Sequence, residues 1–207
     1  MIPTLALLRT LLALRDPALL ATVVGPEGLL RPRRGAMALG TEERHGQEAP
    51  DPGWPDLEPW KALVLPEGPP LRIRVPLVQG SEAFLDLLLE GVHPGIRPPW
   101  IPFTEQLLGK GREVALVTVI AVDGDVPCGL GDRFAYDDHL HGLQPGDRDL
   151  NVRFGRAVEA ARAEGCTRTV PVEMVRGTLE LLVDPLGEAG LRAPNKTPEE
   201  PRRCQTA

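Results

Sequence analysis

The chain has 207 residues, of which 42% are hydrophobic and 25% charged, and these are the proportions of a soluble globular protein. A net charge of −6 and an isoelectric point near 5.3 argue against a nucleic-acid-binding or anionic-membrane surface, because both need a basic face. The three cysteines are odd in number and widely spaced, so we expect no disulfide framework and no C-x-x-C site, and we predict a cytoplasmic protein.

The apolar N-terminus predicts an amphipathic helix over residues 1–14. Its leucines recur at helical spacing, and the absence of a cationic start argues against a signal peptide. Asp16-Pro17 ends this helix, because the residue before a proline avoids the α conformation. The next predicted elements are a buried strand (18–24), a loop rich in Gly, Pro and Arg (25–35), a short strand (36–39), an exposed connection (47–59), a short helix (60–65), a half-buried strand (71–78) and a further strand (84–89).

A proline-rich stretch from His93 to Pro102 is predicted to be a linker, because prolines do not fit a central strand or a helix interior. Beyond it we expect a strand at Val114–Ile120 and a helix at Asn151–Glu164. The apolar face of that helix is predicted to consist of Val152, Ala157, Val158 and Ala161, and Gly165 is a good C-terminal stop. Two further strands (167–173 and 177–183) and a disordered tail (192–207) complete the predictions.

The sequence contains an internal repeat. Residues 11–46 align with residues 107–142 at a constant offset of 96 without a gap, and nine of the 36 pairs are identical. Ordinary composition gives about two or three identities by chance. The identical pairs fall on the apolar strand, on glycines and on one histidine: Leu11/Leu107, Leu12/Leu108, Leu20/Leu116, Thr22/Thr118, Val23/Val119, Gly28/Gly124, Gly35/Gly131, His45/His141 and Gly46/Gly142.

The repeat predicts the domain organisation. We expect an α+β fold of two tandem units (1–92 and 103–191), each a mixed sheet covered by helices, joined by the linker 93–102. A unit of about 90 residues buries too little surface to be robust alone, so the two units should share a core. They are predicted to pack as a pseudo-twofold pair within a monomer, with at most weak further self-association.

Motifs in the second unit resemble the N-terminal domain of the XdhC/CoxI family. The resemblance rests on a strand of the form ALVTVI, on glycines at 124, 131 and 142, on an E-A-A-R helix that ends in E-G at 164–165, and on a G-x-x-E-x-x-V-x-P-L strand from Gly177 to Leu186. The A-T-V-V, E-G and G-A-M segments of the first unit are similar to the same family. Members help to sulfurate the molybdenum cofactor and insert it into xanthine dehydrogenase and related molybdenum hydroxylases. The resemblance implies a molybdenum hydroxylase as partner.

Two family features are missing from this sequence. The glycine-rich G-G-G-C turn, whose cysteine is implicated in cofactor binding, is replaced after Gly46 and after Gly142 by other residues. The family's C-terminal dinucleotide-binding-like domain has no counterpart here, and no G-x-G-x-x-G follows a strand. We therefore predict no bound cofactor from the residues themselves, and molybdopterin only through the resemblance.

Candidate ligand-binding residues lie near the repeated glycines. Guanidinium groups suit phosphate recognition, and a cysteine near a glycine loop offers a displaced thiolate. The candidate cofactor-binding residues are Arg31, Arg33, Arg34, Gly35, His45, Cys128, Gly131 and His141. The structural alternatives are a solvated loop for the arginines, a small buried residue for the cysteine and a hydrogen-bonded histidine at each repeated position.

Asp137, Asp138, His139 and His141 are of metal-ligand type, and in a strand the two histidines would face one side. Asp-Asp is also ordinary turn chemistry, and no metal site is predicted here. Three functions stay open: a non-catalytic accessory or maturation protein of the XdhC/CoxI type, a scaffold for protein interaction without a small-molecule site, and a metal-dependent enzyme built on Asp137 to His141. No catalytic triad is present.

Overall fold

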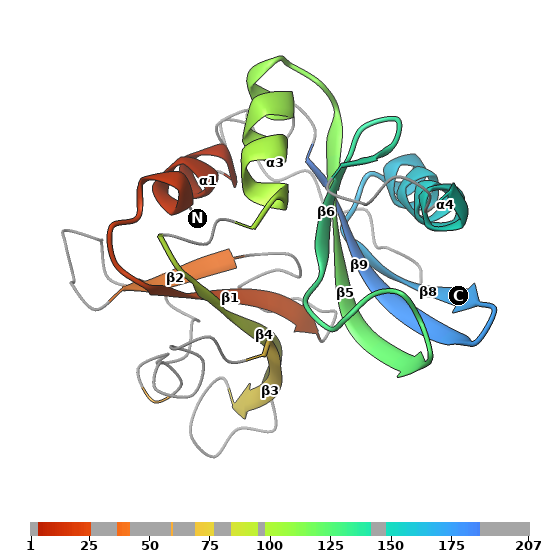
Figure 1. The fold of residues 1–207 in the computed structure, drawn as a ribbon, viewed down its shortest axis with the longest axis horizontal. Coiled ribbons are helices and arrows are strands. Elements are labelled where there is room, and N and C mark those ends of the chain that lie inside the picture. Colours follow the sequence, from red (N-terminus) through yellow and green to blue (C-terminus); the bar gives the residue numbers. More distant parts are fainter. Residues whose placement is uncertain are drawn as a thin grey trace, which may run out of the picture.

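The computed structural model describes residues 4–25, 37–41, 59, 69–76, 84–94, 98–141 and 148–186. Within these ranges it contains three helices and two antiparallel sheets (Figure 1), which confirms the predicted α+β class. All strand pairs that it describes are antiparallel, so the prediction of mixed sheets is wrong. None of the helices described is long and apolar enough to cross a membrane.

The first half of the chain forms a four-stranded sheet. Helix α1 (Thr4–Ala13) leads into β1 (Ala18–Gly25), and β2 (Met37–Thr41), β3 (Leu71–Pro76) and β4 (Phe84–Val92) complete the order β2-β1-β4-β3. Every residue of β1 is buried, as its uninterrupted apolar run predicts for a strand that is covered on both faces. The helix and these strands lie where the sequence places them, with shifts of one to three residues at most ends.

The second half forms a five-stranded sheet of order β7-β6-β5-β9-β8. Its elements are α3 (Trp100–Gly109), β5 (Val114–Gly124), β6 (Arg133–Tyr136), β7 (Leu140–His141), α4 (Arg148–Glu164), β8 (Arg168–Met174) and β9 (Gly177–Leu186). In Figure 1, α4 covers the outer face of this sheet, whereas α1 and α3 lie together at one end of the two sheets. Gly165 follows α4 with a φ of 65°, as expected for a helix stop.

Two boundary predictions need correction. Helix α3 begins at Trp100, so residues 100–102 of the predicted linker are helical. Pro102 is tolerated because N–H groups in the first helical turn have no acceptor within the helix. The apolar face predicted for α4 is also partly wrong, since Val152 is 53% exposed while Phe154 is fully buried. Phe154 lies on the same face as Ala157, Val158 and Ala161, because residues three and four apart share a helix face.

The two sheets have the same pairing register. Met37 lies opposite Thr22 in the first sheet, and Arg133 lies opposite Thr118 in the second, with both members shifted by 96 residues. The pairing of the central strands is interrupted after Val23 in the first sheet and after Val119 in the second. The starts of α1 and α3, of β1 and β5, and of β2 and β6 are likewise 96 residues apart.

Apolar clusters connect the two halves. A cluster around α1 and α3 takes residues from both sheets, among them Ala18, Leu20, Val114 and Leu116. A smaller cluster where the sheets meet contains Val24 and Leu88 from the first half and Ile120 and Leu182 from the second. Because each of these clusters buries side chains of one half against side chains of the other, the two halves share a core, as their small size requires.

A buried ion pair adds to this junction. The side chain of Arg133 is fully buried, donates a hydrogen bond of 2.7 Å to Thr22 Oγ1 and forms an ion pair with Glu90. Its guanidinium also lies 5.1 Å from the ring centroid of Trp100. Desolvation raises the pKa of Glu90 and lowers that of Arg133, and the attraction between the two charges offsets part of each shift.

The cysteines differ from the sequence-based expectation. Cys166 is disulfide-bonded, whereas no disulfide was predicted. Cys128 is buried and forms no disulfide. The cysteines therefore do not support a cytoplasmic location, which stays a prediction.

Candidate functional site

Strands β6 and β7 form a short hairpin that carries three potential metal ligands. Tyr136 pairs with Leu140, so residues 137–139 form the turn between the strands. Asp137 Oδ1 accepts a hydrogen bond of 2.6 Å from the N–H of Asp138 and one of 3.4 Å from the N–H of His139. Hydrogen bonds in which an aspartate carboxylate accepts from the backbone N–H groups of its own turn are typical of hairpin connections.

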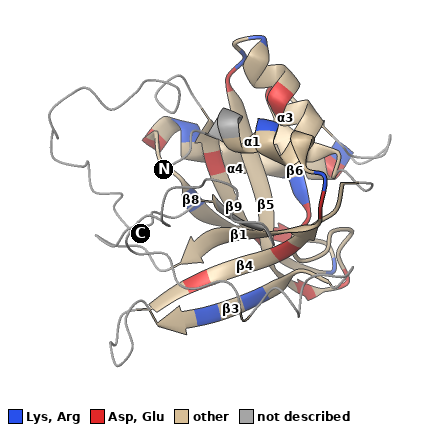
Figure 2. Ribbon diagram, turned by 90° about the vertical axis from the view of Figure 1, so that its left-hand side faces the viewer, with Lys and Arg blue, Asp and Glu red and all other residues tan. Residues whose placement is uncertain are grey.

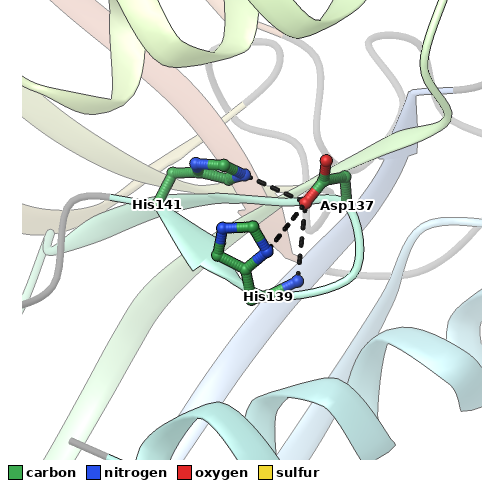
Figure 3. A group of neighbouring side chains, drawn as sticks. All are labelled: Asp137, His139 and His141. Atoms are coloured by element: carbon green, nitrogen blue, oxygen red, sulfur yellow. Dashed lines mark hydrogen bonds and ion pairs between the residues drawn. The ribbon is translucent and has the colours of Figure 1, made fainter. Parts of the chain in front are cut away.

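Two imidazole rings converge on the same carboxylate oxygen (Figure 3). The distance from Asp137 Oδ1 is 2.9 Å to His141 Nε2 and 3.5 Å to His139 Nδ1. The centroids of the two rings are 4.2 Å apart. The sequence predicts that the two histidines face one side if both lie in a strand. His139 instead lies in the turn before β7, so the turn, and not the alternation of side chains along a strand, brings the two rings together.

The carboxylate of Asp137 is held in its ionised form. Partial burial raises its pKa, but hydrogen bonds from the Asp138 N–H and the His141 ring lower it by more, so that the pKa lies well below its ordinary value. The second oxygen, Oδ2, is 3.0 Å from an Arg112 guanidinium nitrogen, which also lies 2.7 Å from Asp138 Oδ2. Arg112 therefore binds the oxygen that faces away from the histidines.

Neighbouring helices fix the hairpin in place. Asn151 Oδ1 of α4 accepts a hydrogen bond of 2.7 Å from the N–H of Leu140. Arg162 of the same helix donates to the carbonyl oxygens of Asp137, at 3.2 Å, and of Glu113, at 2.9 Å. The ring of Phe103, from α3, lies 5.4 Å from the ring of His141. The hairpin is thus attached to both helices that flank it.

The structure puts the described candidate cofactor residues in three different surroundings. Cys128 is packed in the apolar cluster beneath α4. Gly131 has a φ of 86°, and a Cβ there would lie 2.5 Å from Cγ of Pro70 in the first half. His141 lies in the hairpin beside Asp137. The remaining predicted residues, Arg31, Arg33, Arg34, Gly35 and His45, lie outside the described residues.

Sequence reasoning did not single out Arg112. It is 25 positions from Asp137, and no motif connects the two residues. The register of β5 with β6, in which Ala115 lies opposite Tyr136, places Arg112 at the turn of the hairpin. Only the strand pairing could have identified this contact.

No protein-family model matches the chain, and no curated protein matches it. Among solved structures, the chain is similar to the crystal structure of a xanthine dehydrogenase from Bacillus halodurans, with 20% identity and a TM-score of 0.49. The similarity covers 72% of this chain and 44% of that one, so the chain spans less than half of that protein's length.

Proposed function

We propose that this chain is a non-catalytic accessory protein of the XdhC/CoxI type that acts on a molybdenum hydroxylase or on its cofactor. The observation that carries the proposal is the set of family-like motifs in the second half, from the ALVTVI strand to the strand that starts at Gly177. The first half adds a second, more divergent set of the same motifs.

The structural roles of the motif residues support this proposal. The ALVTVI segment lies in the buried first part of β5, and Gly124 and Gly131 both have positive φ values, which favour glycine. A Cβ at Gly124 would lie 2.3 Å from the carbonyl oxygen of Arg176. The backbone conformation at these two positions requires glycine. A protein with the same fold as the family would therefore need glycines at the same places.

A duplicated unit is part of the proposal. The shared strand order, the shared register and the matching interruption of the central strands support an origin of the two halves from one unit. The junction supports a pseudo-twofold arrangement, because Val24 meets Ile120 there and these two residues are related by the offset of 96. The chain would then correspond to a fused pair of domains.

Binding of a molybdenum hydroxylase is the experiment that tests the proposal. Purified chain is titrated against immobilised bacterial xanthine dehydrogenase in its cofactor-free and cofactor-loaded forms, with an unrelated flavoprotein as control. We expect saturable binding to the dehydrogenase, strongest in its cofactor-free form, and none to the control. Equal binding to the control enzyme would favour a general interaction scaffold, and no binding to the dehydrogenase would contradict the proposal.

Cofactor affinity is a separate question. Since the family's cysteine has no counterpart after Gly46 or Gly142, we expect weak or no binding of molybdopterin by the isolated chain. Equilibrium titration measures this directly. Sub-micromolar binding that survives the triple substitution of Arg31, Arg33 and Arg34 by alanine would show that the cofactor site lies elsewhere.

A further inference from the structure

We propose that Asp137, His139 and His141 form a binding site for a divalent transition-metal ion. This inference rests on the hairpin alone and is independent of the proposed function. One carboxylate oxygen and one nitrogen from each histidine lie within 4.8 Å of one another. The three side chains come from a five-residue stretch whose backbone is fixed by β6, β7 and α4.

Two pairs of donor atoms, those that join Asp137 Oδ1 to the two histidines, have the spacing of a metal site. Ligand atoms about 2.0–2.2 Å from a shared ion are roughly 3–3.5 Å from each other. The distances from Asp137 Oδ1 to His141 Nε2 and His139 Nδ1, 2.9 and 3.5 Å, lie at or near the two ends of this range. Closing the turn does not require this arrangement, because turn closure uses only the backbone N–H groups and the carboxylate. His139 in particular is 62% exposed, yet its ring lies beside that of His141.

The surroundings prepare the carboxylate for one metal bond. Arg112 binds Oδ2, so Oδ1 is the oxygen turned toward the histidines and a single bond to the ion is expected. The two carboxylates of Asp137 and Asp138 are balanced by the guanidinium groups of Arg112 and Arg162, so the ligand atoms themselves, and not an excess of negative charge, would attract the ion. Metal binding needs His141 Nε2 without a proton, and the neutral ring can carry its proton on Nδ1 instead.

The ligand types select the class of ion. Two imidazole nitrogens and one carboxylate oxygen suit zinc, cobalt, nickel or iron, whereas magnesium and calcium prefer oxygen ligands throughout. Because His139 is exposed, the ion would face solvent on that side and keep coordination positions for water or an anionic ligand. A site with three protein ligands and open positions differs from the closed four-ligand sites that only stabilise a fold.

The test uses the full chain after treatment with a chelator. Zinc affinity is measured by competition with a chromophoric chelator, and cobalt is added in parallel because its visible absorption reports on the ligands. We expect one equivalent of each metal to bind. His139→Ala and His141→Ala should each weaken zinc binding more than about tenfold and change the cobalt spectrum, since even a change in an outer-shell partner costs about 10- to 100-fold.

The matched control is Asp138→Asn. Asp138 adjoins the site and contacts Arg112, but its side chain is 81% exposed and is not a donor in the cluster. The zinc affinity of the Asp138→Asn variant should stay close to that of the wild type. His139→Ala is the decisive variant because its exposed ring can be removed without disturbing the fold. The proposal is overturned if the wild-type chain binds neither metal stoichiometrically, or if His139→Ala binds zinc as tightly as the wild type.

Discussion

Replacement of Arg133 by methionine is expected to destabilise the fold strongly. Methionine is the residue at the equivalent position of the first half, Met37, so the substitution introduces a side chain that the same register already accommodates. It leaves Glu90 buried without its counter-charge and removes the hydrogen bond to Thr22. Breaking one side of a buried ion pair costs about 3–5 kcal/mol.

The cost should depend on pH and on Glu90. The folded-state pKa of Glu90 already lies above its ordinary value, and loss of the arginine raises it further. A carboxyl group whose pKa is raised by folding makes its full contribution to stability at low pH, and this contribution is lost as pH rises through the pKa of the group in the folded state. R133M should therefore be closest to the wild type in acid and least stable at alkaline pH.

The assay is guanidinium unfolding followed by circular dichroism and tryptophan fluorescence, for which Trp100 beside Arg133 is a local reporter. The double variant E90M/R133M should recover most of the loss, since an apolar pair replaces a buried charged pair at little or no net cost. A loss below about 1 kcal/mol in R133M at neutral pH, or no recovery in the double variant, would refute the importance of this pair.

Three further predictions concern other parts of the fold. Desolvation raises the pKa of Asp184 to about 6, so the contribution of this group to stability falls as pH rises through that value. The unfolding free energy of D184N should exceed that of the wild type by up to about 3 kcal/mol at about pH 8, which is an upper limit for a half-buried group. This gain should vanish in acid. G131A should lose about 2 kcal/mol or more in the same assay, because an added Cβ meets Pro70 at positive φ, whereas G129A, with no contact closer than 3.8 Å, should lose little; equal losses would contradict this. A protease site inserted at residues 95–97 should give two fragments that still co-elute in gel filtration, since apolar clusters span both halves, and separate elution would contradict a shared core.

The sequence predicted the elements that have a strong local signal. The uninterrupted apolar runs of β1 and β5 are buried strands, because a central strand covered on both faces needs no polar alternation. Helix α4 was also predicted, but its buried face was misjudged at Val152, whose direction differs from that of Phe154 by about half a turn. The start of α3 differs from the prediction because a proline in the first helical turn has the same local sequence signal as a proline in a linker.

The contacts between the halves were beyond sequence reasoning. Glu90 and Arg133 are far apart in the chain and meet only because the two sheets pack against each other. Arg112 reaches Asp137 through the pairing of β5 with β6, which no short motif encodes. The residue types of the hairpin indicated ligands, but the convergence of two rings on one oxygen depends on the turn that Asp137 itself stabilises.

The molybdenum content of a co-expressed molybdenum hydroxylase tests the proposed function most directly. Xanthine dehydrogenase is produced in a host that lacks its own accessory protein of this type, with and without this chain, and the molybdenum bound per enzyme is measured by mass spectrometry together with dehydrogenase activity. We predict a higher molybdenum content and a higher activity when the chain is present. Equal molybdenum content and equal activity with and without the chain would contradict an accessory role.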